Sequence, residues 1–71
     1  MVWFMDKIVK NRLRDILNER GISQTWVAKK VGVTRQTISN LINNRFCPSL
    51  ELAFQICDTL GLQLDDVFYY E

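Results

Sequence analysis

The stretch SQTWVAKKVGVTRQTISNLI, residues 23–42, decides the fold of this chain, because it holds two helix starts separated by a helix stop. Ser23 and Thr34 suit the N-cap position, where a side-chain oxygen accepts a hydrogen bond from a free helix amide. Gly32 lies between them and can adopt the left-handed conformation that ends a helix. We therefore predict helices over about 24–31 and 35–43, joined by a tight turn.

The apolar residues of this stretch indicate how the two helices pack. Val27, Ala28 and Val31 recur at helical spacing in the first helix, and Ile38 and Leu41 continue the apolar face in the second. The methyl group of Ala28 is small enough to let the helices cross closely. A small residue, a glycine turn and a branched apolar residue, in that order, are typical of a helix-turn-helix motif.

A helix is also predicted before this motif, over residues 7–19, because Leu13 and Leu17 lie on one helical face and Gly21 follows. Residues 1–6 precede it with two aromatic side chains and no turn residue. They are predicted to be either a short extended arm or the first turn of the helix.

Two further helices are predicted towards the C-terminus. One starts at Pro48-Ser49 and stops at Gly61, and its inward side chains are predicted to be Leu50, Ala53, Ile56, Cys57 and Leu60. A last short helix contains residues 67–68 and is capped by Asp65 or Asp66. The chain of 71 residues is therefore predicted to be a single all-α domain of five helices.

Composition excludes several classes of protein. No apolar run approaches the roughly 20 residues needed to span a membrane, and the opening MVWFM is too short for a secretory signal. We therefore expect a cytoplasmic protein. The chain has no histidine and no CxxC pair, so it predicts no metal site, no cofactor and no enzymatic nucleophile with its base. Cys57 is predicted to be a buried hydrophobe and Cys47 to lie in a loop.

Charge is distributed unevenly along the chain, although the net charge is only +1. Residues 20–50 carry five basic side chains and no acidic one, whereas residues 51–71 carry five acidic side chains and no basic one. The basic block coincides with the helix-turn-helix motif. This distribution predicts one face that attracts phosphate and another that repels it.

The segments ISQTWVAKKVGVTRQTISNLINNR and PSLELAFQICDTLGLQLDDVF resemble the lambda-repressor-like (Cro/Xre) helix-turn-helix DNA-binding family, over about residues 13–68. The resemblance implies a compact five-helix bundle that acts as a dimer on operator DNA. Three positions depart from the family pattern. Trp26 stands at an outward position that is usually polar, Ile42 replaces a glutamate that many relatives use in a buried ion pair, and Asn44 replaces a turn glycine.

The outward positions of the motif's second helix are the candidate base readers. Ile38 and Leu41 are committed to the core, and arginine can pair with guanine while glutamine and asparagine can pair with adenine. The outward side chains are Arg35, Gln36, Ser39 and Asn40, and the resemblance matches Arg35, Gln36 and Asn40 to base-reading positions. The alternative is that these residues are simply solvated.

Other residues are candidates for contacts with the DNA backbone. Gln24 and Thr34 lie at helix N-termini, where free amides and the helix dipole favour phosphate. The resemblance adds Asn43 and Arg45, and Lys30 is a further candidate, although Lys29 and Lys30 could equally be ordinary exposed lysines. Trp26 either covers a groove against the N-terminal arm or offers an exposed contact for DNA or a partner protein.

The two ends of the chain are rich in aromatic side chains: Trp3, Phe4, Phe68, Tyr69 and Tyr70. They either pack against each other within one chain or form a dimer interface, in which residues 67–71 would be a dimerisation tail. We predict a homodimeric repressor that reads a pseudo-palindromic operator in double-stranded DNA, with no small-molecule effector. The alternative is a protein-interaction module on the same fold, such as an antitoxin-like or anti-repressor partner.

Overall fold

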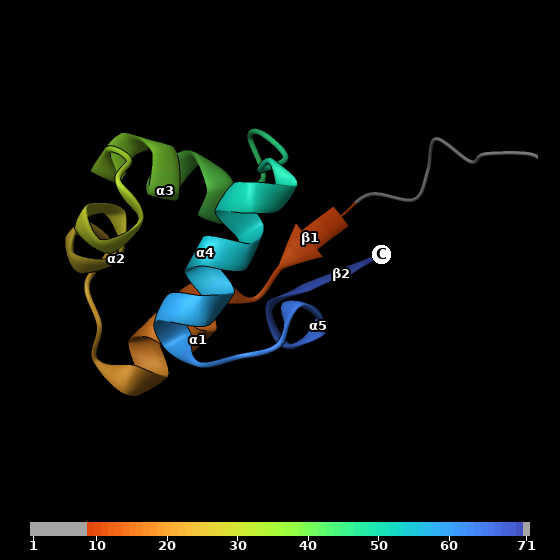
Figure 1. Cartoon of the computed structure of the whole chain (residues 1–71), viewed down its shortest axis with the longest axis horizontal. Coiled ribbons are helices and arrows are strands. Elements are labelled where there is room, and N and C mark those ends of the chain that lie inside the picture. The colour runs from red at the N-terminus through yellow and green to blue at the C-terminus, as the bar shows by residue number, and fades with distance from the viewer. Residues whose placement is uncertain (1–8, 71) are drawn as a thin grey trace, which may run out of the picture.

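The computed structural model describes residues 9–70 of the chain. The arm predicted for residues 1–6, with Trp3 and Phe4, lies outside the described residues. Five helices surround one core, and a pair of short strands lies at the far end of the molecule from the second helix (Figure 1). In chain order the elements are β1 (Val9–Asn11), α1 (Leu13–Arg20), α2 (Gln24–Val31), α3 (Arg35–Ile42), α4 (Leu50–Leu60), α5 (Leu64–Val67) and β2 (Phe68–Tyr70).

The helix-turn-helix motif, α2 and α3, is confirmed with the predicted capping. The Ser23 hydroxyl accepts a hydrogen bond from the Trp26 amide at 3.0 Å, and the Thr34 hydroxyl accepts one from the Thr37 amide at 3.1 Å. Gly32 ends α2 in the left-handed conformation, with a φ of 77°. These local bonds satisfy amides that a helix start leaves free, so the sequence of this motif is sufficient to define its helix starts.

The first predicted helix begins later than the sequence pattern indicated. Residues 9–11 form strand β1 and α1 starts only at Leu13, so the prediction of a helix from residue 7 was wrong. The physical reason is Asn11. Its Oδ1 accepts a hydrogen bond from the Leu13 amide at 3.1 Å, and its Nδ2 donates to the Leu41 carbonyl at 2.9 Å. A short amide side chain of this kind offers the backbone an alternative to the helix.

Strands β1 and β2 pair antiparallel, with Val9 opposite Tyr70 and Asn11 opposite Phe68. Phe68 was predicted to belong to the last helix, and this was wrong, because the chain leaves the helix after Val67 to pair with β1. Part of the predicted dimerisation tail therefore packs on its own chain.

The last helix, α5, has a different N-cap from the one predicted. The N-cap is Gln63, not Asp65 or Asp66. Asp66 still contributes, because its Oδ2 accepts a hydrogen bond from the Gln63 amide at 2.8 Å. The acidic side chain thus acts from the third position of the helix, as in a capping box.

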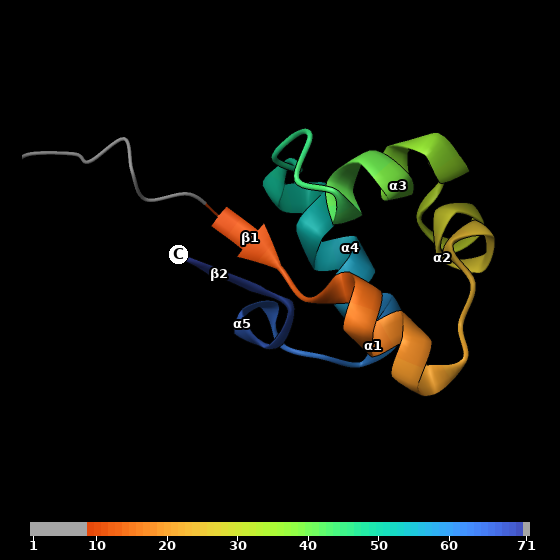
Figure 2. The ribbon, with the colours of Figure 1, turned by 180° about the vertical axis from the view of Figure 1, so that it is seen from behind.

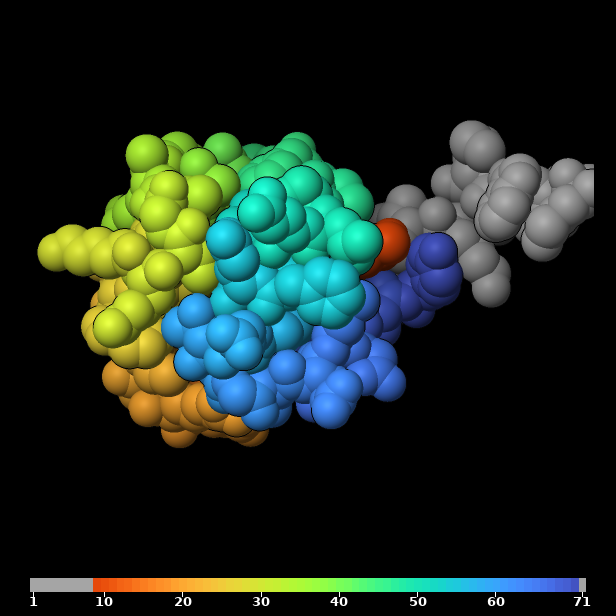
Figure 3. Space-filling view, in the orientation of Figure 1, coloured from red at the N-terminus to blue at the C-terminus, as the bar shows by residue number. Residues whose placement is uncertain are grey.

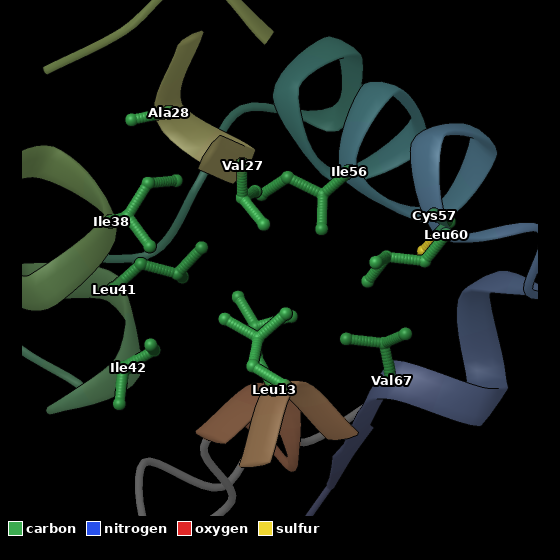
Figure 4. Packing of buried hydrophobic residues seen from close by; sticks show 11 residues of the cluster. Leu13, Val27, Ala28, Ile38, Leu41, Ile42, Ile56, Cys57, Leu60 and Val67 are labelled. Atoms are coloured by element: carbon green, nitrogen blue, oxygen red, sulfur yellow. The ribbon is translucent and has the colours of Figure 1, made fainter. Parts of the chain in front are cut away.

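One apolar cluster holds the helices together (Figure 4). Ile42 is only 6% exposed and joins this cluster, so this position makes an apolar contact in the core. Cys57 is buried and Cys47 lies in a loop, as predicted, and the Cys47 side chain is exposed. Burial, and secondarily the Asp66 carboxylate, raises the pKa of the Cys57 thiol. The fully buried large side chains are Leu13, Val27, Ile38, Leu41, Ile56 and Val67.

The helices of residues 9–70 are short, and α4 is the longest at 11 residues. Within this part of the chain, none is long and apolar enough to cross a membrane.

Candidate nucleic-acid interface

Helix α3 divides its side chains between the core and the surface. Ile38, Leu41 and Ile42 are 0%, 1% and 6% exposed and anchor the helix on the bundle. The four predicted base readers lie on the other side: Arg35 and Gln36 are exposed, and Ser39 and Asn40 are half-buried. The fold therefore places all four on the side of α3 opposite its buried residues. Helix α3 itself runs along the upper edge of the molecule in Figure 1.

Two of these readers are bonded to each other. Gln36 Nε2 donates a hydrogen bond to Asn40 Oδ1 at 3.0 Å, across one turn of α3. Each side-chain amide has both a donor group and an acceptor group, so this bond leaves the Gln36 carbonyl oxygen and the Asn40 amino group available to another partner. An acceptor beside a donor is the pattern that pairs with the major-groove edge of adenine.

A polar hollow of about 290 Å³ lies between the N-terminus of α2, the start of α3 and one side of α1. Two arginines, Arg14 from α1 and Arg35 from α3, line this hollow together with Gln24. Positive charge beside the free amides of a helix N-terminus favours phosphate. Figure 2 shows how the three helices α1, α2 and α3 are arranged.

Arg14 is a residue that the sequence reasoning missed as a site residue. It is exposed, and its Nη2 donates a hydrogen bond to Asn43 Oδ1 at 2.6 Å. Asn43 in turn donates from Nδ2 to the Ser39 carbonyl at 2.9 Å, so it closes the C-terminal end of α3. The signal available in the sequence was the position of Arg14 on the polar side of a helix, but which helix end it would meet depends on tertiary packing.

The turn after α3 has the predicted backbone. Asn44 has a φ of 58°, in the left-handed region that asparagine tolerates better than most residues. The Arg45 amide donates to the Asn40 carbonyl at 2.9 Å, and its side chain is exposed. Arg45 therefore follows α3 directly, with its guanidinium in solvent.

The outer side of α2 carries Trp26 and the two lysines. Trp26 is 43% exposed, and the Lys30 ammonium lies 5.2 Å from the centre of its indole ring, within range of a cation–π contact. Lys29 is also exposed. The interpretation that Trp26 covers a groove against the N-terminal arm concerns residues outside the described part of the chain.

The predicted separation of charge is largely preserved in the fold. Lys29, Lys30, Arg35 and Arg45 are exposed on α2, α3 and the turn that follows, whereas Glu51, Asp58, Asp65 and Asp66 are exposed on α4 and α5. Arg20 is the exception within the basic block. Its Nη1 donates a hydrogen bond to the Leu60 carbonyl at 2.6 Å, so its positive charge stabilises the C-terminal end of α4.

Comparison with known proteins gives an independent view of the same segment. A family model described as helix-turn-helix matches residues 13–67. An HTH-type transcriptional regulator of Methanocaldococcus jannaschii is 40% identical over 63 residues, which cover 89% of this chain and 96% of that protein. The regulator YgzD of Bacillus subtilis is 36% identical over the same share of both chains.

The antitoxin HipB of Escherichia coli is a further relative, 35% identical over 54 residues, which cover 76% of this chain and 57% of that protein. Among solved structures, the transcriptional regulator VanUg superposes with a TM-score of 0.81 at 21% identity and covers all of this chain and 95% of its own. A Bacteroides fragilis protein superposes with a TM-score of 0.80 at 24% identity, covering 87% of this chain and 100% of its own. These superpositions bear out the all-α five-helix fold.

Proposed function

We propose that this chain, which belongs to the Cro/Xre-type helix-turn-helix family, is a dimeric repressor that reads a pseudo-palindromic operator. The family and the relatives support the general part, a DNA-binding transcriptional regulator and not an enzyme. The dimer, the operator and repression are the specific parts of the proposal.

The observation that carries the proposal is the outward side of α3. It bears four polar side chains that can read base edges, and the apolar residues opposite them fix the helix on the core. In this motif the second helix enters the major groove. We assign Arg35 to guanine, and the Gln36–Asn40 pair to adenine, because the pair presents one acceptor and one donor. Ser39 lies between them and can bond to either base.

Contacts with phosphate would hold α3 in register. The hollow beside the N-terminus of α2, which Arg14 and Gln24 line, suits a phosphate group of the DNA backbone. Arg45, just beyond α3, is free to contact a second phosphate, and Lys30 can reach a third from α2. Thr34 and Asn43 lie at the two ends of α3, and their side chains cap those ends. We propose that each contacts the DNA backbone at the end of α3 that it caps.

Repression would follow from occupancy. A dimer places two α3 helices in successive major grooves about 34 Å apart and covers the intervening DNA. Polymerase is then excluded from a promoter that contains the operator. The exposed acidic side chains of α4 and α5 orient each subunit by repelling phosphate. This mechanism requires no small-molecule effector. A protein that acts on operator DNA would work in the cytoplasm.

Selection of bound duplexes from a random library, at near-physiological salt, tests the proposal. We expect enrichment of an inverted repeat whose half-site centres lie about one helical turn apart. The same selection with the Arg35→Ala variant should lose the preference at one position of each half-site. Recovery of unrelated sequences by the wild-type chain would refute a sequence-specific operator.

A second candidate function is an antitoxin-like interaction module, which the similarity to the antitoxin HipB favours. Exposed Trp26 on α2 would then contact a partner protein. The selection separates the two functions, because a module that works only through a protein partner enriches no repeat.

A further inference from the structure

We propose that an apolar surface at the end of the molecule that carries the two strands binds the same surface of a second copy of this chain. We name it the hairpin face and define it by Val9, Leu50, Phe54, Leu64, Phe68 and Tyr70. The inference deepens the proposed function and rests on it, since it supplies the interface of the proposed dimer. It also moves that interface from the chain ends alone to include α4.

The hairpin face leaves large apolar side chains in solvent. Leu50 is 66% exposed, Phe54 53%, Tyr70 70% and Val9 43%. Leu50 and Phe54 lie one turn apart on α4 and so form a ridge along it. Contiguous apolar side chains left in water mark an association surface.

The hairpin face combines exposed apolar side chains with apolar hollows. Two hollows, of about 460 and 240 Å³, share Val9, Leu64 and Phe68 as lining residues. Leu50 lines the smaller hollow and Tyr70 the larger one, while both also protrude into solvent. A surface with both apolar knobs and apolar hollows can dock on its own copy about a two-fold axis, where each knob enters the partner's hollow.

Charge argues for the same occupant. Among the described residues that line the two hollows, Asp65 alone is charged. Hollows with so little charge suit an apolar occupant, and the exposed apolar side chains of a second copy, such as Leu50, supply one. In the space-filling view, the surface of β1 (red) appears beside those of α4 (cyan) and β2 (dark blue), as part of one side of the molecule (Figure 3).

The location of the hairpin face suits a dimer that reads DNA. In Figure 1 the strands lie at one end of the molecule and α2 at the other, with α3 running along the upper edge between them. Joining two copies through the hairpin face would leave the outward side of both α3 helices free. Trp26 belongs to α2, at the opposite end, so it takes no part in this surface.

Sedimentation equilibrium without DNA tests the interface directly. We expect the wild-type chain to be a dimer, and Leu50→Glu and Phe54→Glu each to raise the dimer dissociation constant by about 100-fold or more, because each adds two charges to one symmetric interface. Both variants should keep the helical circular dichroism of the wild type, because both positions are more than half exposed. Leu50 is also the first residue of α4, where a carboxylate suits the helix dipole.

Gln55→Glu is the matched control. It adds the same charge to the same helix at an exposed position, rotated by about 100° from Phe54, and it should leave the dimer intact. A monomeric wild-type chain, or variants that dimerise as well as the control, would overturn the hairpin-face dimer. The proposed DNA function is read separately, as salt-dependent binding of all four proteins to a 30-base-pair random duplex. If Leu50→Glu and Phe54→Glu dimerise as well as the control while all four proteins bind the duplex, only the interface is refuted, whereas absence of binding by every protein refutes the function.

Discussion

The two exposed surfaces of this molecule differ in chemistry and in how their side chains are held. On the α3 side, polar side chains bond to one another, as Gln36 does to Asn40 and Arg14 does to Asn43. On the hairpin face, Leu50 and Tyr70 project into solvent beside apolar hollows. The first surface suits a polar, charged ligand and the second suits an apolar one. In the proposed function, DNA reading and self-association would therefore use separate surfaces of one small domain.

The two surfaces nevertheless depend on the same interior. Asn11 follows Val9 and Lys10 in β1, and its Nδ2 donates to the Leu41 carbonyl of α3. Val67 and Ile38 are both fully buried in the one apolar cluster. A change in the core should therefore damage both surfaces together, whereas a change at either surface should damage only one.

Ile38→Ala should have the largest effect of the substitutions on the α3 side. Ile38 is fully buried, so truncation leaves a cavity and should lower the free energy of unfolding by about 2–5 kcal/mol. Small domains have only about 5–15 kcal/mol in total. Urea denaturation measures the loss, and DNA binding and dimerisation should weaken together at 37 °C. Gln55→Ala, at an exposed site of α4, is the control and should stay within about 0.5 kcal/mol of wild type.

Gln36→Ala should affect only the reading surface. The lost hydrogen bond to Asn40 is exposed, so the free energy of unfolding should hardly change. Discrimination at one base pair of each half-site should fall by about 1–3 kcal/mol. Competition between duplexes that differ at that base pair measures the change, and the dimer dissociation constant should be unaltered. An unchanged preference in a folded variant would exclude Gln36 as a base reader.

The outward side of α3 could be predicted from sequence because its signals are local. Ser23, Gly32 and Thr34 act within one helical turn of themselves, and the spacing of Ile38 and Leu41 decides which side of α3 faces outward. The turn at Asn44 follows the same logic, since its left-handed backbone depends on the residue type. Helix caps and turns of this kind can be predicted from single residue types and their immediate neighbours.

The hairpin face could be predicted only in part, because it depends on contacts between distant segments. The aromatic tail was identified, but Phe68 was assigned to a helix. Leu50 was predicted to face the core and this was wrong, because it is 66% exposed at the start of α4, and Phe54 was not identified as a surface residue. Strand pairing of residues 9–11 with 68–70 brings together segments from the two ends of the chain. The hydrophobic periodicity of either segment alone does not indicate which other segment it pairs with.

Arg45→Ala should have a smaller effect, confined to the DNA backbone. Its side chain is exposed just beyond α3, so its removal should weaken binding to all duplexes alike and reduce the salt slope by about one. Fluorescence anisotropy at several salt concentrations measures the slope. Arg20→Ala is the informative control, because that guanidinium bonds the Leu60 carbonyl. It should lower stability and leave the slope unchanged; equal slopes for Arg45→Ala and wild type would exclude the phosphate contact.

Asn44 gives the smallest predicted effect and tests whether backbone conformation alone defines the turn beside the reading surface. Asn44→Ala places a side chain with no local hydrogen bond at a φ of 58°, which should cost about 1 kcal/mol of stability. Asn44→Gly should be close to neutral, because glycine adopts this conformation freely. The Asn44 side chain contributes little, since its Oδ1 lies 3.5 Å from Asn11 Nδ2. Thermal unfolding of the two variants measures both effects, and an equal loss in each would instead assign the turn's stability to that side-chain contact.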